Sequence, residues 1–239
     1  MSGHSHWSTI KHQKETEDQK RGKSFSKIAR LITIAAREGG GDPGSNPGLR
    51  SVIEKAKSAN MPTKKIDGAI ERGSGEATKE NLERITYEAL GPGGIRIIVE
   101  VITDNKNRTL EDIKQTLSKN GGKLAEIGSV KWLFEQKGTI LVSEKDQAQK
   151  EAIELQVIEA GAEDIRIQED DLIILTQPND LQKVIQSLRE KEIDIRESSL
   201  EWIPKNQVSV SEKEQGKFEK LLLALDQNED VQEVYDNTE

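Results

Sequence analysis

The hydrophobic pattern of this 239-residue chain changes its period once, in the segment 73–79. Before this segment, apolar residues recur every three to four positions, which is typical of amphipathic helices. After it, stretches such as LERITYEAL and GIRIIVEVIT have the alternating, β-branched pattern of strands. The segment itself, GSGEATK, is small and polar and indicates a linker. We therefore expect a helical unit followed by a larger α+β region.

The part before the linker divides into an arm and three helices. Residues 1–20 are polar without apolar periodicity, which predicts a flexible basic arm. Residues 21–75 predict a helical domain. Its first helix, over 22–37, has a core face formed by Phe25, Ile28, Ile32 and Ala35. Asn46 and Pro47 have the sequence of a helix cap and a first helical residue, and a third helix is expected from Pro62 to Gly73.

The part after the linker has two sets of α+β elements. Residues 137–204 follow the order βαββαβ, which is that of ferredoxin-like domains. Residues 80–136 supply two strands, a helix and a further strand, SVKWLFEQ, and residues 205–239 supply one more helix and one more strand. The two flanks are expected to form a second domain, with chain crossings near Gln136 and Pro204. The predicted fold class is α+β: an N-terminal three-helix domain followed by two ferredoxin-like α+β domains, one inserted in the other.

Charge separates the same two regions. Residues 1–72 contain 14 Lys and Arg against 8 Asp and Glu, a net charge of +6, whereas residues 73–239 carry −14. A surface that binds phosphates needs local positive potential, and the acidic remainder would repel a polyanion. The basic helical region is therefore the candidate nucleic-acid contact. The alternative is that the asymmetry serves solubility alone.

A basic stripe opposite the core face of the first helix sharpens this interpretation. Lys20, Lys23, Lys27 and Arg30 lie roughly opposite the apolar residues, and Leu31 and Ile34 lie beside them. Apolar residues on a purely solvated face would be unfavourable, which favours a binding face. The candidate nucleic-acid-binding residues are this stripe, the other cations of the region and one aromatic residue on which a base could stack: Trp7, Lys11, Lys14, Lys20, Arg21, Lys23, Lys27, Arg30, Arg37, Arg50, Lys55, Lys57, Lys64 and Lys65.

No catalytic site is indicated by the sequence. The chain has no cysteine, and its three histidines, His4, His6 and His12, all lie in the arm. Nucleophilic catalysis needs a preorganised base, which such an arm does not provide. We expect no enzyme activity, no cofactor and no metal site. One metal alternative stays open: removal of Met1 would expose Ser-Gly-His, whose nitrogens suit Cu(II) or Ni(II).

Targeting signals are also missing from the sequence. The chain contains no run of about 18 apolar residues that could span a membrane. Its start lacks the apolar core of a secretory signal and the Arg/Ser-rich character of a transit peptide. We therefore expect a cytoplasmic protein without a membrane partner.

Several motifs resemble those of the YebC/PmpR family. They include MSGHSHWSTIKHQK, KRGKSFSKIARLITIAAREGGGDPGSNPGLR, GPGG, TDNKNRT and GSVKWLF, and they run nearly from end to end. The resemblance implies a three-domain cytoplasmic protein without catalytic activity. Family members are generally described as transcriptional regulators that bind promoter DNA, and some as translation factors that act on the ribosome. Two positions depart from the pattern: His6 replaces a common lysine, and Ala89-Leu90 replace the usual Gly-Tyr.

Two functions follow as expectations. The first is a DNA-binding transcriptional regulator whose basic helix contacts the nucleic acid, with protein partners on the acidic α+β domains. The second is a translation factor that binds ribosomal RNA, for which shape and phosphate contacts suffice. The first helix lacks a cluster of Asn, Gln and Arg that could read base edges, which favours the second function, whereas the usual description of the resembling family favours the first. An enzyme that uses the acidic surfaces is a third, remote alternative.

Overall fold

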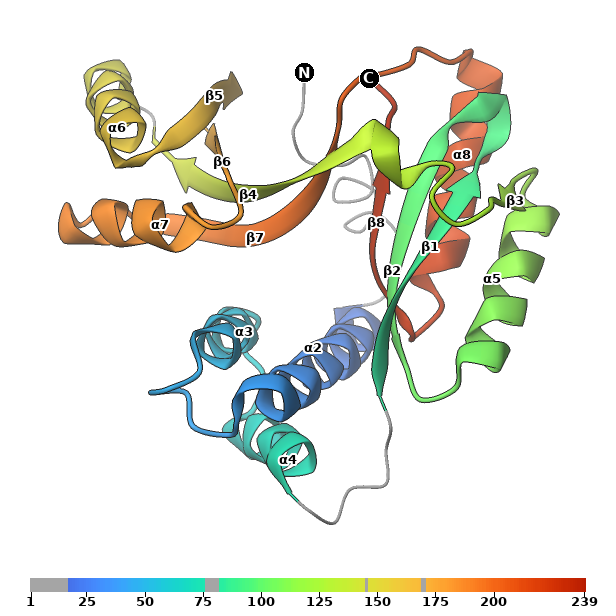
Figure 1. The fold of residues 1–239 in the computed structure, drawn as a ribbon, viewed down its shortest axis with the longest axis horizontal. Helices are drawn as coiled ribbons and strands as arrows, with labels where there is room; N and C mark the ends of the chain where they lie inside the picture. Colours follow the sequence, from blue (N-terminus) through green and yellow to red (C-terminus); the bar gives the residue numbers. More distant parts are fainter. Residues whose placement is uncertain (1–16, 76–81, 145, 169–170) are drawn as a thin grey trace.

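The computed structural model describes residues 17–75, 82–144, 146–168 and 171–239. The chain forms three parts (Figure 1). Helices α2 to α4 form one part, a sheet covered by α5 and α8 forms the second, and a sheet covered by α6 and α7 forms the third. The fold class is therefore α+β, as the sequence predicts.

The helical part consists of α2 (Glu17–Gly39), α3 (Pro47–Ser58) and α4 (Thr63–Ser74). The expected core face of α2 is confirmed, because Ile28 and Ile32 pack into a buried cluster with residues of α3 and α4. Asn46 caps α3, since its side-chain oxygen accepts a hydrogen bond from the Leu49 backbone N–H at 3.0 Å. Its amide group donates to the Ala35 carbonyl at 2.8 Å, so the same residue ties α3 to α2.

Gly73 is the penultimate residue of α4, which ends at Ser74, so the expected end of this helix is confirmed to within one residue. A Cβ atom at this position would lie 2.2 Å from the Thr33 carbonyl oxygen of α2. Glycine is therefore required here for the close approach of two helices, and not as a helix stop. The Thr33 hydroxyl also donates to the Ala69 carbonyl across the same contact.

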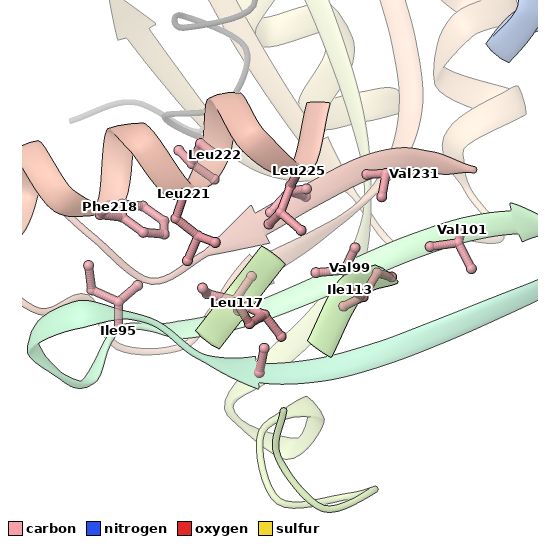
Figure 2. Packing of buried hydrophobic residues seen from close by; sticks show 13 residues of the cluster. Ile95, Val99, Val101, Ile113, Leu117, Phe218, Leu221, Leu222, Leu225 and Val231 are labelled. Carbon is pink, nitrogen blue, oxygen red and sulfur yellow. The ribbon is translucent and has the colours of Figure 1, made fainter. Parts of the chain in front are cut away.

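The first sheet has the antiparallel strand order β3-β1-β2-β8. Its strands are β1 (Glu83–Leu90), β2 (Arg96–Thr103), β3 (Lys123–Leu124) and β8 (Val231–Asp236). The turn between β1 and β2 contains Gly93 and Gly94 at φ of 69° and 81°, a conformation that favours glycine. Helices α5 (Lys106–Lys119) and α8 (Glu212–Asp226) cover one face. Figure 2 shows the core between them, in which Leu117 and Phe218 lie over the strands.

The second sheet has the antiparallel order β5-β6-β4-β7. It consists of β4 (Phe134–Ser143), β5 (Ala162–Gln168), β6 (Asp171–Thr176) and β7 (Ile195–Pro204). Helices α6 (Gln147–Ala160) and α7 (Leu181–Glu190) pack Val157, Val184 and Leu188 against Ile140 and Ile174. The connectivity is the expected βαββαβ of ferredoxin-like domains.

The expected strand SVKWLFEQ is wrong. Residues Lys131–Leu133 form a short 3-10 helix, and Phe134 instead begins β4, which runs without a break to Ser143. β4 pairs with β7 from Phe134 opposite Pro204 onward, so one strand crosses the position near Gln136 where we expected a boundary. Gly138, which resembles a strand-breaking residue, is needed because a Cβ there would lie 2.3 Å from the Thr176 hydroxyl oxygen.

The other face of the first sheet carries both remaining parts of the molecule. Near one end, Ile98 and Tyr235 pack with Phe134 and Trp202 of the second sheet. Near the other end, Ile102 packs with Ile34 of α2. The first sheet therefore packs against both other parts, the second sheet near one end and the helical part near the other.

Candidate nucleic-acid interface

Two cations of the basic stripe of α2, Lys27 and Arg30, are turned toward the first sheet. Lys27 is only 7% exposed, and its Nζ lies 2.7 Å from Oδ1 of Asp226. The Arg30 guanidinium donates to the Ile102 carbonyl at 2.8 Å and forms an ion pair with Asp230. The expectation that Lys27 and Arg30 lie on an open binding face is therefore wrong. Both cations hold the helical part to the turn between α8 and β8.

Leu31 and Ile34 explain why the stripe is covered. Ile34 is 0% exposed and packs with Ile102 and Leu82, and Leu31 lies against the same cluster. These residues are the ones that the sequence places beside the cations. α2 thus buries a second apolar strip besides its core face, and that strip contacts another part of the chain instead of a ligand.

Asp230 is the centre of this contact. Its buried carboxylate accepts hydrogen bonds from Arg30, from Arg108 at 3.2 Å and from the Thr109 hydroxyl. Burial would raise the pKa of Asp230, but the bonds from Thr109, Arg30 and Arg108 outweigh it and hold the pKa below its ordinary value. Arg108 and Thr109 belong to the TDNKNRT motif, so this motif stabilises the junction. Sequence reasoning missed Asp230, whose only local signal is an acidic turn, NED, before a strand.

Lys55 is also occupied by the other parts of the chain. Its Nζ lies 3.7 Å from Oε1 of Glu233 on β8 and 3.9 Å from Oε1 of Glu197 on β7. Its neighbour Glu54 pairs with Arg189 at the end of α7 at 2.8 Å. α3 therefore contacts both sheets through charged side chains.

The remaining cations gather around the turn between α3 and α4. Residues 55–66 contain four lysines and no acidic residue. Lys57 lies in the last turn of α3, and Lys64 and Lys65 lie in the first turn of α4; all three are exposed. Arg50 is exposed two turns earlier, on the same face of α3 as Lys57. Lys65 lies over the Phe25 ring, with Nζ 5.1 Å from the ring centre. We call Arg50, Lys57, Lys64 and Lys65 the exposed basic cluster.

The N-terminus of α4 adds to this positive potential. Its capping position is Pro62, which forms no side-chain capping hydrogen bond, and its first turn contains no acidic residue. The unpaired backbone N–H groups and the helix dipole make such an end positive. Lysines there weaken the helix by about 0.3–1 kcal/mol, because like charges meet. These positive charges therefore repel one another in the free protein, and a bound anion would neutralise the repulsion.

The other candidate residues lie outside the exposed basic cluster. Lys23 is half-buried on α2, and Arg37 is exposed but donates to the Leu82 carbonyl. Lys20 and Arg21 lie on α2, with side chains outside the described part of the structure. Trp7, Lys11 and Lys14 lie outside the described residues, as does the Ser-Gly-His segment with its possible metal-binding nitrogens.

Neither a metal-binding group nor a membrane-spanning helix occurs in the part of the chain that the structure describes. In residues 17–75, 82–144, 146–168 and 171–239, no group of three or more His, Asp or Glu side chains is arranged to hold a metal ion. No helix in the same residues is long and apolar enough to cross a membrane.

The fold and the exposed basic cluster define a class of three-part α+β proteins, in which a basic helical unit contacts two antiparallel sheets. Residues 5–76 match the family model of the TACO1/YebC protein N-terminal domain, and residues 82–238 match that of the TACO1/YebC second and third domain. The chain therefore belongs to the TACO1/YebC family.

Curated relatives and a solved structure agree with this assignment. A protein of Petrotoga mobilis is 48% identical over 239 residues, covering 100% of this chain and 95% of the relative, and is named "Probable transcriptional regulatory protein". A protein of Halothermothrix orenii with the same name is 46% identical over 240 residues, covering 99% and 94%. The crystal structure of a conserved hypothetical protein from Aquifex aeolicus is 42% identical, with a TM-score of 0.88 over 98% of this chain and 97% of that one.

Proposed function

We propose that this chain is a cytoplasmic, non-enzymatic regulator of gene expression that binds nucleic acid, of the DNA-binding transcriptional type that its relatives' names describe. The observation that carries the proposal is the exposed basic cluster at the positive end of α4, in a protein whose formal net charge is −8. A cluster of this kind attracts phosphates locally, while the acidic body limits contact elsewhere. Lys27 and Arg30 have no part in the proposed contact. The acidic α+β surfaces are left to protein partners.

A second candidate is a ribosome-associated translation factor that binds ribosomal RNA. One observation favours it: the cations of the exposed cluster lie around a turn between two helices, whereas Lys27 and Arg30 of α2 are covered. A turn of this kind contacts phosphates but does not place a row of side chains in the major groove. Phosphate contacts and shape are sufficient for structured RNA.

The exposed basic cluster is tested by replacing Arg50, Lys57, Lys64 and Lys65 together with alanine. We expect weaker binding to a duplex DNA or to ribosomes, because each lysine or arginine that contacts a phosphate releases a counterion. The slope of the logarithm of affinity against the logarithm of salt concentration should fall in magnitude by roughly 3 to 4 for duplex DNA. Fluorescence anisotropy over a salt series measures it.

The matched control replaces four exposed lysines of α5 and α8, Lys119, Lys213, Lys217 and Lys220, with alanine. It removes the same number of positive charges but should leave the salt slope near that of the parent. Equal slopes for the two variants would show that binding does not depend on the proposed cluster. Sequence preference among duplexes supports the transcriptional function, whereas co-sedimentation with ribosomes without such preference supports the translational one.

A further inference from the structure

The segment between β3 and β4 displays two apolar side chains to solvent. Ile127 is 99% exposed and Trp132 is 64% exposed. They lie five residues apart in the segment 125–133, which we call the Trp132 loop. Single exposed apolar residues are normal on protein surfaces, so exposure alone has little meaning. The hydrogen bonds that hold the loop distinguish Ile127 and Trp132 from other exposed apolar residues.

A buried carboxylate holds the Trp132 loop in one conformation. Glu88 of β1 is 5% exposed, and its two oxygens accept from the backbone N–H groups of Gly128 at 2.5 Å, Val130 at 2.6 Å and Lys131 at 2.7 Å. Burial alone would raise the pKa of Glu88, but these three bonds hold the pKa below its ordinary value. Hydrogen bonds to a charged acceptor are stronger than neutral ones, so the loop is rigid at its base.

The Trp132 side chain is fixed as well. Its Nε1–H donates to the Ser129 carbonyl at 3.0 Å, within the loop itself. Val130 and Leu133 point the other way, into the cluster around Ile98 and Tyr235. The loop therefore directs Val130 and Leu133 inward and leaves Ile127 and the indole of Trp132 in solvent. A site in which an aromatic side chain is already oriented loses little entropy when a ligand binds.

The charge around the Trp132 loop differs from that of the surrounding protein. Lys123 lies two residues before the loop, and the Lys205 N–H bonds to the Leu133 carbonyl at 2.9 Å. Lys131 lies within the loop, with Nζ 4.7 Å from the centre of the Trp202 ring. All three lysines are exposed. Glu126 is the one exposed acidic residue of the loop. Residues 73–239 as a whole carry −14. Glu135, which follows the loop, is exposed as well, so three exposed lysines stand here against two exposed acids. Flat aromatic surface with adjacent lysines is the combination that binds bases and phosphates together.

We propose that the Trp132 loop is a second nucleic-acid contact, in which the Trp132 indole stacks on an unpaired base and Lys123, Lys131 and Lys205 contact its phosphates. Ile127 would pack against the neighbouring base or sugar. A base within a duplex is stacked on both faces, so the preferred ligand is a single strand, a loop or a bulge. The proposal extends the proposed function to another part of the chain and rests on it only for the class of ligand.

The test measures binding of the full chain to a single-stranded 20-nucleotide RNA, a single-stranded DNA of the same sequence and a duplex. We expect W132A to weaken single-strand binding by about 5- to 100-fold, as loss of one stacked base does. W132F should retain most of the affinity, because a phenyl ring still stacks. The control L155A/I158A removes two exposed apolar residues of α6 and should bind like the parent.

Tryptophan fluorescence gives a readout that loss of folding would not imitate. Stacking of a base should quench part of the parent's emission on titration with the single strand, and W132F should lack that part. Unchanged single-strand affinity of W132A, with the quenching retained in W132F, overturns the proposal and leaves protein docking as the role of the loop. The exposed-basic-cluster variant separates this result from the proposed function: if it loses duplex or ribosome binding while W132A binds normally, only the Trp132 loop is excluded.

Discussion

Replacing Asp230 with alanine is expected to lower the free energy of unfolding by about 3–5 kcal/mol, the range found when one partner of a buried ion pair is removed. The carboxylate has three partners, and its loss leaves Arg30, Arg108 and the Thr109 hydroxyl without their shared acceptor. Arg30 comes from the helical part, and the other two come from α5. The substitution should therefore loosen the junction between the helical part and the first sheet as well as the first sheet itself.

Denaturant unfolding, followed by far-UV circular dichroism, measures this effect. D104A is the matched control, because Asp104 also pairs with Arg108, at 2.7 Å, but is exposed. Exposed pairs contribute about 0–1 kcal/mol, so D104A should remain near the parent. Equal stability of D230A and D104A would contradict the role assigned to Asp230. The pKa of Asp230 is lowered on folding, so its contribution is present at neutral pH and is lost as the pH falls below the ordinary pKa of 3.8.

The covered cations of α2, Lys27 and Arg30, show what hydrophobic periodicity can and cannot predict. The core face was predictable because Ile28 and Ile32 repeat at helical spacing and meet helices of the same unit. The fate of Lys27 and Arg30 depended on acids about 200 positions away in the chain. A helical projection separates the faces of one helix but does not show what packs against each of them. Leu31 and Ile34 indicated that something covers this face of α2. A partner within the same chain explains these apolar residues as well as a ligand would.

The α+β region shows a similar division. Most helices and strands were predictable, because alternation, caps and glycine turns act within a few residues. The start of β4 was not, since a 3-10 helix at Lys131–Leu133 interrupts an apparently regular apolar run. The anchoring of that segment depends on Glu88, which lies on β1 some 40 residues earlier. A buried carboxylate that binds three backbone N–H groups leaves no local pattern, so the Trp132 loop emerged only from the structure.

Most of the exposed basic cluster could be recognised from sequence, because its members lie close together in the chain. Lys57, Lys64 and Lys65 flank one short turn, and the absence of acidic residues from 55–66 is visible directly. Lys55 lies in the same segment but pairs with Glu233 and Glu197 from both sheets. Burial and ion pairs within the chain therefore reduce a list of plausible cations to the few that a ligand can reach.

Glu201 should make the protein less stable as the pH rises from 5 to 8. It lies half-buried on β7, and its pKa is raised from 4.5 to about 7. Burial is the main cause; Glu233 of β8 and Glu197 of β7 raise the pKa further, whereas the Ser199 hydroxyl and Lys55 of α3 lower it. Because the folded-state pKa exceeds the unfolded value, the folded state binds the proton more tightly. Its ionisation therefore opposes folding, by up to about 3 kcal/mol above pH 7.

The variant E201Q tests this sign, because glutamine keeps the shape of the side chain but cannot ionise. E201Q should be more stable than the parent at pH 8, and the difference should shrink to near zero below about pH 3.5, where Glu201 is protonated in both states. Urea unfolding at several pH values measures it. The control E151Q removes an exposed carboxylate of α6 and should retain the parent's pH dependence. A constant difference between E201Q and parent at all pH values would mean that Glu201 ionises normally. A difference that grows with pH would instead confirm that Glu201 ionises at a raised pKa where α3, β7 and β8 meet.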